Sequence, residues 1–205
     1  MLPGAASATQ PQNFWVWFQE NRGFLESYAT NTQAVTRALG GRLQNVDRGL
    51  TYELGQAADG VYEFIVSANG IRDVFPEVIR LVRAAPKIEG WRIVAFRPRR
   101  PDALTSRLDY AGMSMSGEDI WYRLEDGGGA FNLSVHIRGL DPANEKTAVG
   151  AAFLMLDLAL GEYDVATKLR SIDFAPLPPD PAALGLKPLN DLPREVDARF
   201  PASEN

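Results

Sequence analysis

Apolar and polar residues alternate in two stretches of the chain, and a turn interrupts each stretch. In the first, residues 50–54 and 61–68 flank Asp59-Gly60. In the second, residues 120–124 and 131–137 flank Gly127-Gly128-Gly129. Two alternating apolar runs on either side of such a turn are typical of a β-hairpin. The pattern therefore predicts two hairpins, one in each half of the chain.

A helix and a further strand are predicted after each hairpin. Apolar residues recur at helical spacing, and short apolar runs follow at 91–96 and 169–174. The helical positions are Phe75, Val78, Ile79 and Val82 in the first half, and Val149, Phe153, Leu156 and Leu160 in the second. The order strand, strand, helix, strand thus occurs twice, in pseudo-repeats at about residues 50–98 and 119–176. Chance similarity between short amphipathic strands is the alternative.

These elements predict the α+β class, with the two ββαβ pseudo-repeats forming one mixed, antiparallel-rich sheet and the helices on one face. Alternation in residues 131–137 supports burial of a single face. A long helix should precede the sheet, from Phe14 to Leu39, with Gly40-Gly41 as its stop. We expect a single domain over residues 13–175.

Both ends of the chain differ in composition from this domain. Residues 1–12 are small and polar, which predicts a disordered lead-in. Residues 176–205 hold half of the 14 prolines, which predicts an extended, irregular C-terminal tail packed on the body. Whether this tail covers the polar face of the sheet is left open by the sequence.

Composition excludes several function classes. The formal net charge is −5 and no basic run occurs, so no nucleic-acid partner is expected. There is no cysteine and only one histidine, so we expect no disulfide, no thiol nucleophile, no metal site and no cofactor. No signal peptide and no stretch long enough to cross a membrane is recognised, which predicts a soluble, cytoplasmic protein without membrane contact.

The first candidate site is an arginine corner, formed by Arg97, Arg99 and Arg100 where a predicted strand ends beside two prolines. Guanidinium groups held in this way can bind a carboxylate or phosphate with two hydrogen bonds. The alternative is a solvated cluster that pairs with some of the 26 acidic residues. We favour this second interpretation, because charged residues on a protein surface usually form only weak, solvated ion pairs.

The second candidate site is the polar face of the sheet. If the strands pair as predicted, polar residues of both hairpins should share it: Trp121, Arg123, Asn132, Ser134, His136 and Arg138 from the second hairpin, and Thr51, Glu53, Glu63 and Ser67 from the first. Such a face can hold a ligand or a partner's chain, and it can equally be solvated or covered by the tail. A lone histidine becomes a catalytic base only beside a nucleophile and an orienting group.

Evidence for catalysis is weak. Glu53 and Glu63 could face each other across the first hairpin, and Glu118-Asp119 precede the second, but a solvated surface explains them as well. The chain has no phosphate-binding loop, nucleophile elbow, zinc-protease motif or dinucleotide fingerprint. We therefore predict no catalytic residue and expect a protein that is not an enzyme.

Several motifs resemble an uncharacterised family of bacterial proteins. They are Phe14-Trp15-Val16-Trp17-Phe18 followed by Asn21, residues 64–71 leading to Phe75-Pro76, residues 85–91, and Ala95-Phe96-Arg97-Pro98-Arg99. The resemblance is strongest between Phe14 and Arg99. It implies a bacterial cytosolic origin, and it assigns no functional residue.

Two hypotheses about function follow. The first is a non-enzymatic protein-binding or accessory module. The second is a protein that binds a small anionic ligand, or an enzyme, using the arginine corner or the polar sheet face. A homodimer through Trp15 and Trp17 is a further hypothesis, and burial of both tryptophans in the core is its alternative.

Overall fold

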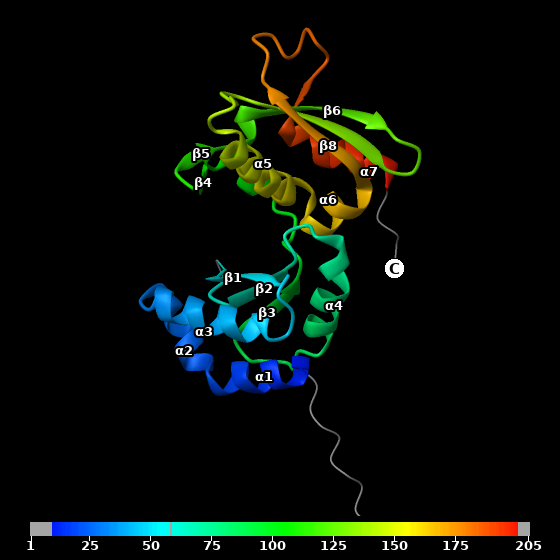
Figure 1. Cartoon of the computed structure of the whole chain (residues 1–205). Coiled ribbons are helices and arrows are strands. Elements are labelled where there is room, and N and C mark those ends of the chain that lie inside the picture. The colour runs from blue at the N-terminus through cyan, green and yellow to red at the C-terminus, as the bar shows by residue number, and fades with distance from the viewer. Residues whose placement is uncertain (1–9, 58, 201–205) are drawn as a thin grey trace, which may run out of the picture. The chain divides into compact units, whose positions relative to one another are not determined.

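The computed structural model describes residues 10–57 and 59–200, and it has the predicted α+β class (Figure 1). The chain folds as two compact units, of which unit 1 ends at Phe96 and unit 2 begins at Arg97. This boundary falls close to the end of the first predicted repeat.

Unit 1 contains a three-stranded sheet in the order β1-β2-β3, in which β2 is antiparallel to β1 and parallel to β3. Its helices and strands are α1 (Gln10–Glu20), α2 (Arg22–Glu26), α3 (Thr32–Gln44), β1 (Thr51–Gln56), β2 (Tyr62–Ser67), α4 (Phe75–Arg83) and β3 (Trp91–Ala95), with 3-10 turns at Ser27–Ala29 and Arg72–Val74.

The N-terminal helical region is present, but its predicted bounds as one long helix were wrong. Three helices replace it, because the helix breaks at Asn21 and again between Ser27 and Asn31. Gly40-Gly41 does not stop α3, which runs on to Gln44. Residues 10–12 of the predicted lead-in belong to α1, and the rest of the lead-in lies outside the described residues.

The core of unit 1 centres on Phe64 in β2, whose ring lies 5.2–6.1 Å from the rings of Phe14, Trp15 and Phe18 in α1. The neighbouring Ile65 points to the opposite face of the sheet and is buried as well. Both faces of this sheet are therefore covered, in contrast to the one-sided burial that we predicted.

Unit 2 contains a four-stranded sheet in the order β8-β7-β6-β9 and a separate two-stranded sheet, β4-β5. Its elements are β4 (Leu108–Tyr110), β5 (Met113–Met115), β6 (Ile120–Asp126), β7 (Phe131–Ile137), α5 (Glu145–Leu160), α6 (Glu162–Lys168), β8 (Leu169–Pro176), β9 (Lys187–Pro188) and α7 (Leu192–Arg199), with 3-10 turns at Pro101–Thr105, Gly117–Asp119 and Leu189–Asp191.

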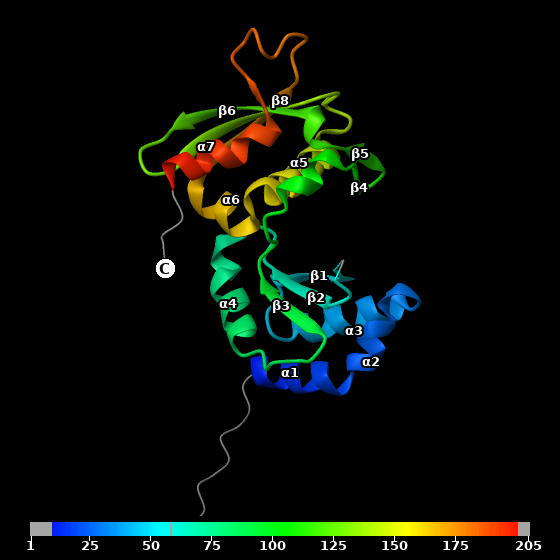
Figure 2. The ribbon, with the colours of Figure 1, turned by 180° about the vertical axis from the view of Figure 1, so that it is seen from behind.

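One face of the four-stranded sheet is covered by helices, as predicted. Phe131, Leu133, Val135 and Ile137 alternate with half-buried polar residues along β7. Both views of the chain place α5, α6 and α7 on the same side of this sheet (Figures 1 and 2). The apolar face therefore packs on the helices, and the polar face does not.

The C-terminal tail has more regular structure than its prolines predicted. Lys187–Pro188 pairs with β6 as the short edge strand β9. Leu189, Leu192 and Val196, from the last turn and from α7, are fully buried in the core of unit 2. These residues of the tail thus pack on unit 2, and α7 covers the apolar face of its sheet.

The two units share one topology. In each, a hairpin is followed by helix and then by a strand that lies parallel to the second hairpin strand. The two sets of strands form separate sheets, so the prediction of one shared sheet was wrong. The shared order of elements does not by itself confirm the pseudo-repeat, which stays a prediction.

Candidate functional site

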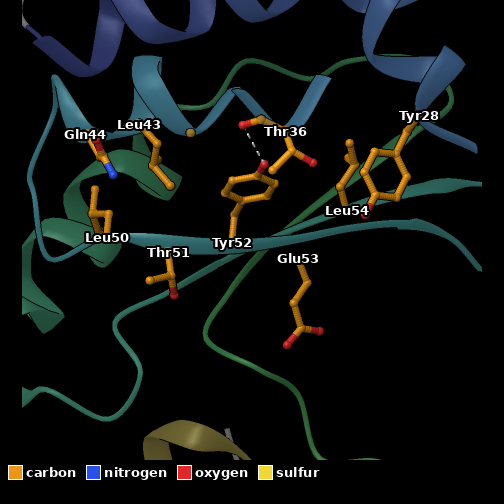
Figure 3. A pocket seen from close by; sticks show the side chains of 10 residues that line it. Tyr28, Thr36, Leu43, Gln44, Leu50, Thr51, Tyr52, Glu53 and Leu54 are labelled. Carbon is orange, nitrogen blue, oxygen red and sulfur yellow. Dashed lines mark hydrogen bonds between the residues drawn. The ribbon is translucent and has the colours of Figure 1, made fainter. Parts of the chain in front are cut away.

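A groove in unit 1 runs between α3 and the outer edge of β1, with a volume of about 470 Å³. Figure 3 shows the side chains that line it. They come from the turn before α3, from one side of α3 and from the segment that enters β1: Tyr28, Thr36, Gly40, Leu43, Gln44, Leu50, Thr51, Tyr52, Glu53 and Leu54. The groove is therefore built from one helix and one strand edge.

Tyr52 forms the floor of the groove. Its hydroxyl donates a hydrogen bond to the carbonyl oxygen of Thr36 over 3.1 Å, and its ring lies 5.9 Å from that of Phe64. A Cβ at Gly40 would lie 3.9 Å from the ring, which is an ordinary contact distance, so the ring packs close to this part of α3. Burial raises the pKa of the Tyr52 phenol, and a hydrogen bond with the Thr36 side chain partly offsets this effect.

The side chains of β1 divide between two faces. Figure 3 shows Tyr52 and Leu54 on the side of α3, whereas Thr51 and Glu53 point the other way. This alternation is the ordinary pleat of a strand. Glu53 is exposed, so the face opposite α3 carries a negative charge next to the strand edge.

The outer edge of β1 carries no strand among the described residues. The N–H group of Ala57 donates to the carbonyl oxygen of Val61, which makes these two residues a hydrogen-bonded pair of the hairpin. Such pairs alternate along an antiparallel ladder. Tyr52, Leu54 and Gln56 therefore direct their N–H and C=O groups away from β2, along the groove.

The arginine corner lies against the end of α5 in unit 2. The Arg97 guanidinium is 3.4 Å from the Asp157 carboxylate, and that of Arg99 is 3.0 Å from Asp197. The backbone N–H groups of Arg97 and Arg100 donate to the Glu162 carboxylate and to the carbonyl oxygen of Leu158. The segment is thus attached to the helices by its own charges, which supports the structural interpretation.

Three of the predicted residues, Trp121, Arg123 and His136, lie on the polar sheet face of unit 2. Trp121 lies directly opposite His136, and Arg123 opposite Ser134. The guanidinium of Arg123 donates to the carbonyl oxygen of Leu184 over 2.6 Å, and Nδ1 of His136 is 3.4 Å from the carbonyl oxygen of Pro176.

Arg138 does not join this face. It follows β7, and its guanidinium is 3.3 Å from Asp119. The Asp119 carboxylate also accepts the N–H of Ser116, in the capping box that starts the turn before β6. This predicted site residue and Asp119, the second residue of the acidic pair before the second hairpin, therefore stabilise a turn.

The two glutamates of the first hairpin do not lie opposite each other. Glu53 pairs with Ile65, and Glu63 pairs with Gly55. The Glu63 carboxylate lies 3.3 Å from the Arg92 guanidinium. The arrangement provides a surface ion pair, and not the closely spaced carboxylates of an acid and base pair.

In residues 10–57 and 59–200, no three side chains of the types that bind metals are grouped as an ion would require. None of the helices in this part of the chain is both long and apolar enough to cross a membrane.

Comparison of the chain with protein-family models, with curated proteins and with solved structures gives no significant match. Function is therefore argued from the geometry of the site. Sequence reasoning missed the groove, and its only signals were the glycines inside α3 and the alternation of residues 51–54, the first strand of the first hairpin.

Proposed function

We propose that the protein is a non-enzymatic binding module that takes an extended segment of a partner protein as an additional strand on β1. The observation that carries the proposal is the groove itself. Open N–H and C=O groups lie along one of its sides, and apolar side chains lie along its floor. Strand addition uses these two features, since the backbone bonds supply affinity and the side-chain sites supply specificity.

The other surfaces support this choice. The arginines that could bind an anion contact carboxylates of their own unit. On the polar sheet face, Arg123 and His136 already contact backbone carbonyl oxygens of their own unit. The groove of unit 1 combines depth with unused backbone groups, and an extended chain fits it better than a compact ligand does. The cysteine-free sequence is compatible with a partner in the cytoplasm.

The test starts with a display library of random peptides, selected on the full chain. Selected peptides are then measured against two variants of one residue, Leu54→Ala and Leu54→Pro. Both variants lose the leucine side chain, but only proline also removes the outward N–H. Proline on an edge strand with its nitrogen toward solvent is tolerated. Circular dichroism confirms that both variants are folded.

We expect Leu54→Pro to bind the peptides about tenfold more weakly than Leu54→Ala, because about 1.4 kcal/mol is near the net worth of one hydrogen bond. Failure to select any peptide, or equal affinities of the two variants, would contradict the proposal. Sedimentation tests whether a second copy of the chain, instead of a partner protein, occupies the edge of β1. A wild-type dimer that Leu54→Pro converts to a monomer would show that a second copy occupies the edge.

A further inference from the structure

Unit 1 has a second pocket, which shares no lining residue with the groove at β1. Its walls include Val82 and Ala85, from α4 and the segment after it, and Trp91 and Ile93 from β3. Among the described residues, β3 is the one strand that contributes to it, which places the pocket at the outer edge of the sheet. Its volume of about 350 Å³ is at the lower end of the range for small-molecule sites, about 300–1,000 Å³.

Trp91 gives this pocket a fixed aromatic wall. Its indole N–H donates a hydrogen bond to the Glu26 carboxylate over 3.0 Å. The ring centre lies 5.1 Å from that of Tyr62, with 22° between the two planes, and 4.9 Å from that of Phe18. A side chain held in this way has little rotamer freedom left to lose when a ligand binds. The apolar part of a ligand therefore meets a preformed surface.

The backbone of Ile93 supplies open hydrogen-bonding groups. The carbonyl oxygen of Gly90 and the N–H of Phe96 bond to β2, so the even-numbered residues of β3 face β2 and Ile93 directs its backbone groups outward. Ile93 is half-buried, and neither group has a partner in the part of the chain that the structure describes. A partly buried N–H without an acceptor costs free energy, which a ligand oxygen would recover.

Lys87 is the charged residue of the pocket. It is exposed, whereas the other lining residues are buried or half-buried. Its ammonium forms no ion pair and no hydrogen bond with any residue of 10–57 or 59–200. Glu89, two residues further on, does not line the pocket. The pocket thus combines an apolar interior with one positive charge at its rim.

From these features we propose that the pocket binds a small amphipathic carboxylate, one molecule per chain. The apolar part of the ligand lies against the Trp91 indole and the aliphatic side chains of Val82, Ala85 and Ile88. The carboxylate accepts hydrogen bonds from the Ile93 N–H and from the Lys87 ammonium. Hydrogen bonds to a charged group are the stronger class, so an uncharged analogue should bind less well.

Other ligand classes fit this edge less well. A partner strand would find few open bonds, because β3 has five residues and the N–H of Trp91 already donates to the carbonyl oxygen of Ile88. A phosphate would place a third oxygen against apolar walls, where an unpaired polar atom is costly. The site is on the opposite edge of the sheet from β1, so it does not depend on the proposed function.

The first experiment titrates the full chain with two acids, 3-phenylpropionate and hexanoate, in a calorimeter. The amides of both acids and acetate are titrated in parallel. We expect each acid to bind with one site per chain, each amide to bind about tenfold more weakly, and acetate not to bind. Absence of binding by both acids, or equal affinities of acid and amide, would overturn the proposal.

Variants then test the two parts of the pocket. Lys87→Gln keeps most of the side chain and removes its charge, so it should bind the acids about as weakly as the wild type binds the amides. Lys146→Gln, at an exposed lysine of α5, is the matched control and should bind as the wild type does. Ala85→Leu should fill the pocket and abolish binding, with its fold checked by circular dichroism. Unchanged affinity of Lys87→Gln or of a folded Ala85→Leu would overturn the proposal.

Nuclear magnetic resonance locates the bound probe. Addition of 3-phenylpropionate should shift the backbone amide signal of Ile93 and the indole signal of Trp91. The amide signal of Tyr52, in the groove at β1, and the indole signal of Trp121, in unit 2, should stay in place. Shifts that centre on Tyr52 or Trp121 would show that the acid binds elsewhere and would overturn the proposal.

Discussion

The hydroxyl of Tyr52 and the carbonyl oxygen of Thr36 are 3.1 Å apart, and their hydrogen bond joins the edge strand β1 to α3 across the floor of the groove. The bond explains how an edge strand with one neighbour in its sheet keeps a fixed distance from the helix. It also makes Tyr52 both a structural and a ligand-facing residue.

We expect Tyr52→Phe to keep the fold and to lower the free energy of unfolding by roughly 0.5–1.5 kcal/mol, the net worth of one hydrogen bond. Peptide binding should weaken less than in Leu54→Pro, because the backbone edge is intact. Urea unfolding followed by circular dichroism measures the first effect. A loss above about 3 kcal/mol would show that the ring itself has moved.

Trp15 should be the most sensitive residue of α1. Its indole is 2 % exposed and donates a hydrogen bond to the carbonyl oxygen of Leu81 over 2.8 Å. Trp15→Ala should cost about 3–5 kcal/mol through the cavity it leaves. Trp15→Phe should cost about 1–3 kcal/mol, because Leu81 loses its donor.

Trp17 is the control, because it is only half-buried. The guanidinium of Arg42 lies 5.3 Å from the centre of its ring. Trp17→Phe should change the free energy of unfolding by less than about 1 kcal/mol. Equal losses for Trp15→Phe and Trp17→Phe would contradict the structure. The burial of Trp15 also removes it from the dimer interface that we had considered.

The Arg97 ion pair should matter for stability. Its guanidinium and the Asp157 carboxylate are 15 % and 11 % exposed. Removal of one partner of a buried pair leaves a charge in a poorly solvated place, so Arg97→Ala should cost about 3 kcal/mol. Arg194→Ala, at an arginine that is 83 % exposed, should stay within about 0.5 kcal/mol of the wild type. Denaturant unfolding of both variants decides the point.

Alkaline pH should destabilise unit 2 through Tyr122. Burial, followed by the negative charge of Glu195, raises the pKa of this phenol above its ordinary value of 10.0. The folded chain therefore holds the proton at a pH where the unfolded chain releases it. Stability from this residue is complete below pH 10 and falls as the pH rises above the unfolded pKa.

Tyr122→Phe should consequently show a flatter dependence of unfolding free energy on pH above pH 10 than the wild type. Tyr163→Phe, at a tyrosine that is 48 % exposed, is the matched control. Urea unfolding at a series of alkaline pH values provides the measurement. If the unfolding free energies of Tyr122→Phe and the wild type depend on pH in the same way, the raised pKa of the Tyr122 phenol is contradicted.

Two glycines should respond to alanine in opposite directions. Gly161, between α5 and α6, has a φ of +84°, and its Cβ would lie 3.4 Å from the Arg99 nitrogen. Gly161→Ala should cost about 1–2 kcal/mol. Gly23 lies in α2 with nothing within 4 Å, so Gly23→Ala should stabilise by about 0.5–1 kcal/mol. Thermal unfolding of both variants tests the pair.

The local elements of the fold could be predicted from the sequence, because alternation and helical spacing are local signals. Residues 131–137 show this well, since every predicted inward residue is buried. Sheet assembly could not be predicted in the same way. Whether β3 and β6 share one sheet depends on contacts between distant residues, which no local pattern encodes.

The predicted sites failed for a related reason. Arg97 and Arg99 stand out by charge, but their carboxylate partners lie about sixty or more residues along the chain. The groove is marked only by Gly40, by Tyr52 and by an edge with no neighbour. Glycines in a helical pattern are typical of a helix stop, so Gly40-Gly41 misled the prediction of where α3 ends.

The proline in β9 has a consequence for solubility. Pro188 presents no N–H on the outer side of the sheet of unit 2, so edge-to-edge growth of that sheet into aggregates is blocked at this side. β1 has no proline and no bulge in its register with β2. The β9 edge is therefore blocked, whereas the β1 edge can nucleate aggregation, so we expect the wild-type chain to precipitate at lower concentration than Leu54→Pro when its partner is absent.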